Sequence, residues 1–238
     1  MNIDYRERLI FALDLPTIKE ARNIVQLLGD QVRVLKLGME LSMNAGYWDF
    51  VEELLVDDYK VFVDLKLFDI PETVGRAIKV MSERGVTFTT VHGNDKVMEV
   101  AAANKGDTLK VLAVTALTSL DQGDLTDLGF DCNVEELVLS RAKRALELGC
   151  DGVISSGLEV AALRQHIDNK LTVVVPGIRP VSNDDDQKRI STVSSVFAAG
   201  ADYIVVGRPI RDSQDPYSAA KNINSQIDLA TMRRYNVD

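Results

Sequence analysis

The chain has 238 residues, of which 46% are hydrophobic and 26% are charged, and its formal net charge is −9. This composition is typical of a soluble globular protein, and the acidic balance argues against binding to nucleic acid or to an anionic membrane. No apolar run is long enough to cross a bilayer, and residues 1–8 lack the apolar stretch of a signal peptide. We therefore expect a cytoplasmic protein. If it binds an anionic ligand, its positively charged side chains must be gathered at that binding site.

Short runs rich in β-branched residues alternate with longer segments that carry apolar residues at helical spacing. Residues 18–28 and 134–148 show this helical spacing clearly. Gly29, Gly85, Gly149 and Gly200 each follow such a segment, where a C-cap glycine is expected. The predicted strands are 9–14, 33–37, 61–66, 87–92, 110–115, 152–155, 172–175 and 203–206.

Strict alternation of strands and helices predicts an α/β fold with a parallel sheet. Eight such units in 238 residues favour a closed (β/α)8 TIM barrel, with residues 1–238 as a single domain. The alternative, a doubly wound open sheet, lacks support because no G-x-G-x-x-G follows the first strand. The longest connections are predicted at 116–132 and 177–190, and loops of that length are usually functional or mobile.

Charged residues stand where the first predicted strands end, which is where barrel enzymes place their chemistry. They are Asp14 on the first strand, Lys36 on the second, and Asp64 and Lys66 on the third, with Asp69 just beyond and His92 at the end of the fourth. Buried ion pairs can be structural, and they are weak evidence for stability. Four charged groups on three consecutive strands are better explained by function.

Side chains on a strand alternate between its two faces. Asp64 and Lys66 should therefore both point into the barrel mouth, while Val63 and Leu65 face the helices. Burying charges is costly unless they are paired. We expect an alternating network of carboxylate and ammonium groups.

The residue types narrow the chemistry of this network. A metal site fits poorly because the chain has only two histidines and no H-x-x-x-H spacing, and because lysines repel a divalent cation. The two cysteines, Cys132 and Cys150, match no metal or redox motif and are expected to be buried or idle thiols. Lys66 could form a Schiff base, but flanking carboxylates favour its protonated, weakly nucleophilic form. A proton donor that quenches a carbanion is the better interpretation.

The motif Asp64-x-Lys66-x-x-Asp69-Ile70-Pro71-x-Thr73 resembles the signature of the orotidine 5′-phosphate decarboxylases. The resemblance covers essentially the whole chain. The pattern D-x-K-x-x-D also occurs in sugar-phosphate decarboxylases of the same barrel superfamily, but Ile-Pro-x-Thr and the later Pro-Gly-Ile-Arg-Pro favour the nucleotide enzyme. Further matching motifs are Phe11-Ala-Leu-Asp14, Lys36-Leu-Gly38, Val114-Thr-Ala-Leu-Thr-Ser119, Pro176-Gly-Ile-Arg-Pro180 and Gly207-Arg-Pro-Ile210.

The resemblance implies decarboxylation of orotidine 5′-monophosphate to uridine 5′-monophosphate, the last step of de novo pyrimidine synthesis, with no metal or organic cofactor. Lys66 is implied to donate a proton to C6 after CO2 leaves, and Asp64 to lie next to the substrate carboxylate. Lys36 and Asp14 are implied to hold the ribose hydroxyls and to position the network.

The resemblance also implies a homodimer with composite sites. Asp69, Ile70 and Thr73 are then expected to reach into the site of the neighbouring subunit. Of the pair Thr118 and Ser119, we expect Thr118 to make the nucleotide contact. His92 is expected to pack and hydrogen-bond at its strand end rather than to ionise for catalysis.

The loops after the seventh and eighth strands of these barrels often bind phosphate. Gly177 and Gly207 allow close backbone approach, and Arg208 offers a guanidinium fork to phosphate oxygens. The resemblance adds Arg179 and Gln187 as phosphate-side residues. It also implies that residues 181–189 form a lid, although a solvated loop or helix start explains the same polar composition.

Three other functions remain open. A phosphosugar decarboxylase shares the barrel and the D-x-K-x-x-D motif but needs Mg2+. A phosphosugar isomerase or epimerase would use a metal–histidine or glutamate cluster, which the sequence does not offer. A nucleotide-binding protein without activity would not need the complete set Lys36, Asp64, Lys66 and Asp69.

Overall fold

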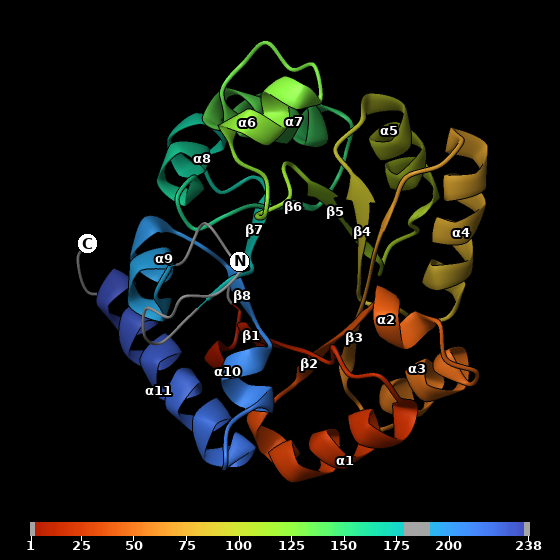
Figure 1. Ribbon diagram of the computed structural model, residues 1–238, viewed down its shortest axis with the longest axis vertical. Coiled ribbons are helices and arrows are strands. Elements are labelled where there is room, and N and C mark those ends of the chain that lie inside the picture. The colour runs from red at the N-terminus through yellow and green to blue at the C-terminus, as the bar shows by residue number, and fades with distance from the viewer. Residues whose placement is uncertain (1–2, 179–190, 236–238) are drawn as a thin grey trace.

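The computed structural model of the protein describes residues 3–178 and 191–235. Its strands are all parallel and close into a barrel in chain order, so that the last strand pairs with the first (Figure 1). The predicted TIM barrel is confirmed, and every predicted strand lies within two residues of an observed one. The strands are β1 (Leu9–Ala12), β2 (Val34–Gly38), β3 (Lys60–Leu67), β4 (Phe88–His92), β5 (Lys110–Val114), β6 (Gly152–Ile154), β7 (Thr172–Val175) and β8 (Tyr203–Val206).

Helices surround the barrel, and Figure 1 looks onto the end at which the strands finish. The outer ring consists of α1 (Ile18–Leu28), α3 (Tyr47–Val56), α4 (Pro71–Glu83), α5 (Asp95–Asn104), α7 (Val134–Glu147), α8 (Val160–Ile167), α9 (Val193–Ala199) and α11 (Pro216–Tyr235). Three short helices follow strands directly or in a loop near the barrel mouth: α2 (Met39–Ser42), α6 (Gln122–Asp127) and α10 (Arg208–Arg211). The 3-10 turns are η1 (Tyr5–Glu7) and η2 (Gly29–Gln31). No helix in the described parts of the chain is long and apolar enough to span a membrane.

Alternation along the strands produces two separate apolar cores. On β1, Phe11 faces the helices and belongs to the large outer core, whereas Ile10 faces the barrel interior. Inside the barrel, the Phe88 ring meets Phe62 and Tyr203 edge to face, with ring centroids 6.0 and 5.4 Å apart. These three rings form part of the apolar core inside the barrel.

Local sequence accounts for where the helices begin and end. The Thr17 hydroxyl accepts a hydrogen bond from the Glu20 amide and so caps α1, whose buried residues follow the predicted helical spacing. Gly29 ends α1 with a φ of 52°, a conformation that costs glycine little. The other glycines predicted to end helices also have positive φ, which confirms that prediction: Gly85, Gly149 and Gly200.

Of the two long connections predicted from the sequence, 116–132 and 177–190, the structure describes the first in full and only part of the second. Residues 116–132 are not a plain loop, because they contain α6, whose N-terminus has a capping box between Asp121 and Asp124. This short helix was not predicted, because its six residues give no periodic signal. Most of the second connection, residues 179–190, lies outside the described residues.

Candidate active site

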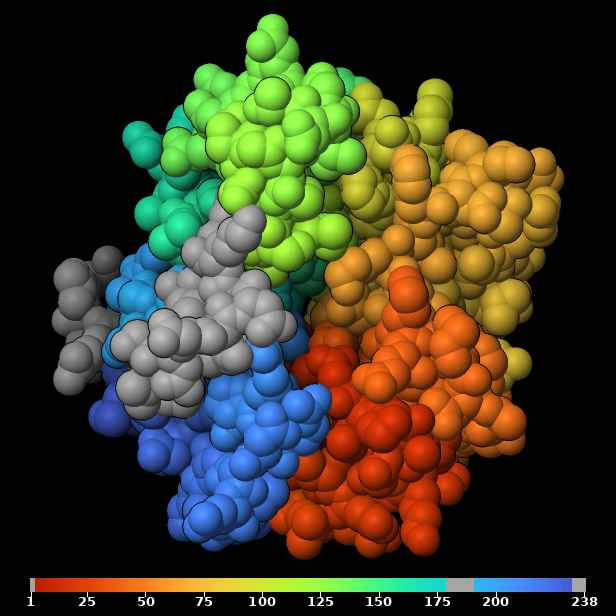
Figure 2. Space-filling view, viewed as in Figure 1, coloured from red at the N-terminus to blue at the C-terminus, as the bar shows by residue number. Residues whose placement is uncertain are grey.

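A cavity of about 310 Å³ opens at the barrel mouth. Figure 2 shows the surface hollowed near the centre of this end, between the red and orange N-terminal segments and the green segment after β5. Its apolar wall comes from strand residues that include Val114, Ile154 and Val205, together with Pro176. The charged residues among those that line it are Asp14, Lys36, Asp64, Lys66, Arg208 and Arg211. Cations outnumber carboxylates in this set although the whole chain is acidic, as a site for an anionic ligand requires.

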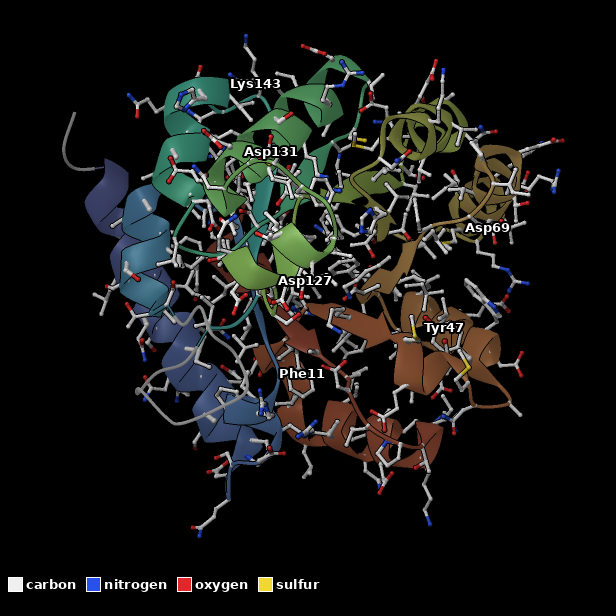
Figure 3. The ribbon with its side chains drawn as sticks, turned by 45° about the horizontal axis from the view of Figure 1, so that its top comes forward. Phe11, Tyr47, Asp69, Asp127, Asp131 and Lys143 are labelled. Carbon is white, nitrogen blue, oxygen red and sulfur yellow. The ribbon has the colours of Figure 1, made fainter. Side chains whose placement is uncertain are left out.

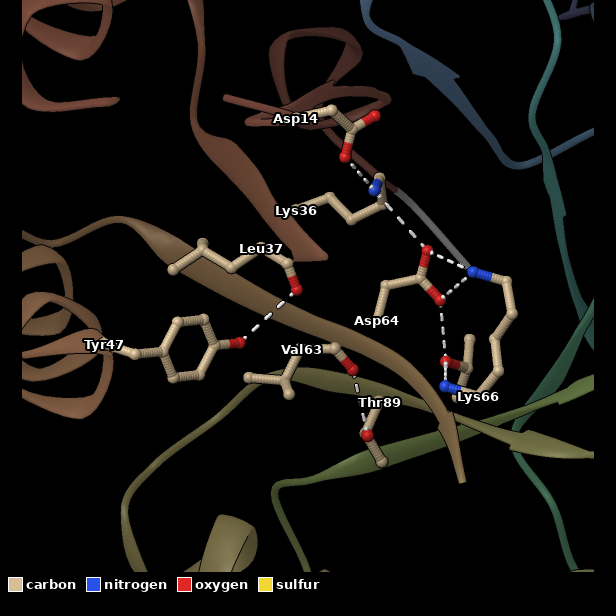
Figure 4. Close-up of polar contacts among 9 residues, drawn as sticks. Asp14, Lys36, Leu37, Tyr47, Val63, Asp64, Lys66 and Thr89 are labelled. Atoms are coloured by element: carbon tan, nitrogen blue, oxygen red, sulfur yellow. Dashed lines mark hydrogen bonds and ion pairs between the residues drawn. The ribbon is translucent and has the colours of Figure 1, made fainter. Parts of the chain in front are cut away.

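The four predicted charged residues form one continuous network (Figure 4). Lys36 Nζ lies 2.9 Å from Asp14 Oδ1 and 3.5 Å from Asp64 Oδ2. Lys66 Nζ lies 3.0 Å from both carboxylate oxygens of Asp64. Charges therefore alternate from β1 to β3, which lowers the cost of placing them inside the barrel mouth.

Exposure separates the two lysines. The side chain of Lys36 is only 10% exposed and lies between two carboxylates, whereas that of Lys66 is 39% exposed. Asp64, at 11%, is nearly covered by the groups that hold it. Lys66 is therefore the ammonium group that faces the open cavity, and Lys36 fixes the carboxylates behind it.

The surroundings of Asp64 stabilise its charged form. Burial by itself would raise the pKa of this carboxyl, but the charges of Lys36 and Lys66 and the hydrogen bonds from Thr90 and Lys66 outweigh burial and hold the pKa below its usual range. Tyr47, which donates a hydrogen bond to the Leu37 carbonyl oxygen, has a raised pKa because of its own burial and the nearby Asp64 charge. Asp64 is thus ionised whenever the cavity is open to neutral water.

Strand β3 is irregular at the site. Val63 pairs with Thr89 and Leu67 with Val91, so three residues of β3 lie opposite one residue of β4. Within this bulge Lys66 has a φ of 48°, a left-handed conformation that is uncommon for lysine. Simple alternation was therefore an incomplete explanation, although both predicted side chains do line the cavity and Val63 and Leu65 do pack toward the helices. Bulges commonly redirect side chains beside active sites.

The opposite side of the cavity carries the predicted phosphate-side residues. Gly177, with a φ of 78°, Gly207 and Arg208 all line it. Arg211, which the sequence analysis did not single out, lines it as well and donates a hydrogen bond of 2.7 Å from Nη1 to the Asp14 carbonyl oxygen. Its position one turn after Arg208 was the available signal. The predicted residues Arg179 and Gln187, and the predicted lid 181–189, lie outside the described residues.

Thr118 and Ser119 differ in position. Thr118 lines the cavity from the segment after β5, whereas Ser119 is exposed and does not belong to the described lining.

Gly38 contributes by its small size, because a Cβ atom there would lie 3.1 Å from Asp14 Oδ1 and 3.3 Å from Lys36 Nζ. Any larger residue would crowd the ion pair at the end of β2.

Asp69, Ile70 and Thr73 do not join the network within one chain. All three are exposed, and none lies among the described residues that line the cavity. Asp69 lies beside the start of α4 (Figure 3), and its Oδ1 accepts a hydrogen bond from the Ile70 amide. Within one chain, these three residues therefore lie outside the described lining of the cavity.

His92 packs as predicted, with its ring centroid 4.9 Å from that of Phe68. The predicted hydrogen bond was only half right, because its carbonyl oxygen accepts one from the Asn94 amide while the buried ring Nδ1 has no partner among the described residues. Burial and the nearby charge of Arg141 lower the pKa of His92. The neutral ring is therefore favoured.

The remaining titratable groups give no second centre of this kind. In the described ranges no three His, Cys, Asp or Glu side chains gather where they could hold a metal ion. Cys132 and Cys150 are free thiols, and burial raises the pKa of Cys150 to about 12. The lysine–aspartate network is the feature that demands a chemical explanation.

Comparisons with known proteins agree with this geometry. Residues 7–223 match the family described as Orotidine 5′-phosphate decarboxylase / HUMPS family. A protein named orotidine 5′-phosphate decarboxylase from Methylococcus capsulatus is 62% identical over 227 residues, which cover 94% of this chain and 93% of that protein. Another so named, from Nitrobacter winogradskyi, is 47% identical over 92% of this chain and 91% of its own length.

A solved structure supports the same assignment. The crystal structure of orotidine 5′-phosphate decarboxylase from Lactobacillus acidophilus superposes with a TM-score of 0.84 at 37% sequence identity, and the match covers 93% of this chain and 99% of that one. On the family match and these relatives, the chain belongs to the orotidine 5′-phosphate decarboxylase / HUMPS family.

Proposed function

We propose that this protein is a carboxy-lyase that converts orotidine 5′-monophosphate to uridine 5′-monophosphate and CO2, without a metal or organic cofactor. One observation carries the proposal: a cavity that holds the Lys66 ammonium 3.0 Å from both Asp64 oxygens also contains Arg208 on its other side. The Lys66 ammonium beside Asp64 can stabilise a carbanion, and the Arg208 guanidinium can bind a phosphate group. The names of the relatives point to the same substrate.

The reaction breaks the bond between C6 and the carboxylate, and the electron pair remains on C6. Lys66, the more exposed of the two lysines, stabilises that pair by its charge and then transfers one proton to C6. Lys66 recovers a proton from solvent, so the sum is substrate plus one proton giving product plus CO2. Asp64 lies beside the substrate carboxylate, and the repulsion between the two is relieved as CO2 departs.

Lys36 and Asp14 bind the ribose hydroxyls. Their 2.9 Å ion pair at the ends of β1 and β2 supports this role, because Asp14 is 48% exposed toward the mouth and Lys36 is buried behind it. Gly38 leaves the pair uncrowded. Thr118, on the segment after β5, contacts the pyrimidine.

Gly177, Gly207 and Arg208 bind the phosphate, together with Arg179 and Gln187, which the family resemblance assigns to the same end. Because the phosphate does not react, its binding energy serves to position the ring against Lys66 and Asp64.

The active form is a homodimer with composite sites. Asp69, Ile70 and Thr73 are exposed and outside the described lining of their own cavity, so each chain supplies them to its partner. Large apolar side chains are exposed near the ends of β2 and β3, and such surfaces mark interfaces: Met39 is 60% exposed, Met43 76%, Phe68 64% and Ile70 70%.

We further propose that residues 1–238 fold as one domain and that the protein works in the cytoplasm. A closed barrel that runs from Leu9 to Val206 supports one folding unit. The free thiols Cys132 and Cys150 are consistent with a reducing compartment.

The ultraviolet absorbance of purified protein mixed with orotidine 5′-monophosphate tests the function directly. We expect the substrate spectrum to change to that of uridine 5′-monophosphate, at the same rate with and without a chelator. A phosphosugar decarboxylase would leave the nucleotide unchanged and would require Mg2+ with its own substrate. No spectral change with a folded protein would contradict the proposal.

A further inference from the structure

The Thr90 side chain on β4 occupies an unusual place behind the charged network. It is fully buried and does not belong to the described lining of the cavity. Its Oγ1 accepts a hydrogen bond of 2.9 Å from the backbone amide of Lys66 and donates one of 2.7 Å to Asp64 Oδ1. One hydroxyl group therefore contacts both residues of the proposed reacting pair.

The β-bulge explains why a hydroxyl is needed at this position. Thr90 is the single residue of β4 opposite Asp64, Leu65 and Lys66. Lys66 lies where the pairing between β3 and β4 is interrupted, and its amide donates to the Thr90 hydroxyl. A buried amide without a partner is costly. The Thr90 hydroxyl oxygen accepts the hydrogen bond that a backbone carbonyl would accept in a regular sheet. The hydroxyl then donates its own hydrogen bond to the Asp64 carboxylate.

These contacts form a closed ring. The Lys66 amide donates to Thr90, Thr90 donates to Asp64, and the Lys66 ammonium returns to the same Asp64 oxygen at 3.0 Å. This ring requires a side chain that accepts and donates a hydrogen bond at the same atom. The hydroxyl group of serine can do so, whereas valine has no polar atom. We infer that Thr90 is a positioning residue that fixes the strained backbone of Lys66 and the carboxylate of Asp64 in one geometry, so that the ammonium enters the cavity at the reacting carbon.

This inference rests on the proposed function, and steady-state kinetics with orotidine 5′-monophosphate test it. We expect Thr90→Val to lower kcat by about 10- to 100-fold with KM changed by less than about threefold, because misplacing a reacting group costs rate more than ground-state binding. Thr90→Ser restores the hydroxyl and should return kcat to within about threefold of the wild type.

The chain offers a matched control in the neighbouring residue. Thr89 is also fully buried on β4 and donates to β3, at 3.0 Å to the Val63 carbonyl oxygen. It faces the helices, because its Oγ1 also lies 3.3 Å from Met81 Sδ on α4. Thr89→Val should lower the thermal unfolding midpoint about as much as Thr90→Val while leaving kcat near the wild-type value. A role of Thr90 in stability alone predicts no difference in kcat between these two variants.

Three results would overturn the inference: wild-type kcat in Thr90→Val, a Thr90→Ser variant as slow as Thr90→Val, or an equal loss of kcat in Thr89→Val. If Thr90→Val does not fold, Thr90→Ala compared with Thr90→Ser, which differ by one oxygen atom, gives the same readout. A folded wild type that leaves the nucleotide unchanged contradicts the proposed function. An active wild type with an unimpaired Thr90→Val contradicts only the role of Thr90.

Discussion

Asp64 and Lys66 stand two residues apart on β3, and the Lys66 ammonium lies 3.0 Å from both oxygens of the Asp64 carboxylate. This part of the strand is bulged, and Lys66 adopts a φ of 48° within the bulge. The backbone, rather than a flexible side chain alone, therefore sets the direction in which the ammonium points.

Lys66→Ala should reduce kcat by at least about 10⁴-fold, because it removes both the proton donor and the charge that stabilises the carbanion. Binding of uridine 5′-monophosphate, measured by calorimetry, should persist because the phosphate and ribose contacts remain. Lys60→Ala is the matched control, since Lys60 begins the same strand and pairs with Glu7 outside the cavity. Substantial turnover by Lys66→Ala would exclude Lys66 as the donor.

The stability of the protein should depend on Asp64 at low pH. Because the folded pKa of Asp64 lies below its ordinary value of 3.8, its charged form contributes stability above that value, and the contribution is lost as the pH falls through the folded pKa. Denaturant titrations of the wild type and Asp64→Asn from neutral pH downward should give unfolding free energies whose difference is constant near neutral pH and shrinks as the pH falls below 3.8. A constant difference between the two proteins across that range would show that the Asp64 charge does not contribute.

Arg208→Ala should lower kcat as well as affinity, because phosphate binding helps to position the reacting ring. The expected loss in kcat/KM is about 10²-fold or more, equivalent to one or two charge-assisted hydrogen bonds. The nucleoside without its phosphate provides the control, since its slow turnover should be the same in variant and wild type. Full recovery of the rate at saturating orotidine 5′-monophosphate would limit Arg208 to simple binding.

Mixing two inactive variants tests the composite site. Lys66→Ala and Asp69→Ala should each be nearly inactive alone, but a mixed dimer contains one site with Lys66 from one chain and Asp69 from the other. After subunit exchange at equal concentrations, activity should rise to about a quarter of the wild type. If Asp69 acts within its own chain, no mixture will recover activity. Analytical ultracentrifugation of each variant checks that the dimer itself is intact.

Much of this protein is determined locally in its sequence. The eight strands and the helices between them follow from apolar periodicity and from glycines such as Gly29 and Gly200, because each signal lies within one element. Strand-end positions identified Lys36, Asp64 and Lys66, because a barrel brings the carboxyl ends of its strands to one mouth.

Tertiary structure decided the rest. The bulge in β3, the left-handed Lys66 and the role of Thr90 depend on the register between β3 and β4. Strand register is set by contacts between segments distant in sequence, so no local pattern in residues 61–66 reveals it. The same holds for Arg211, which reaches the Asp14 carbonyl oxygen across 197 residues. The sequence determined which chemical groups meet at the barrel mouth, and only the pairing of neighbouring strands determined the direction in which the Lys66 ammonium points.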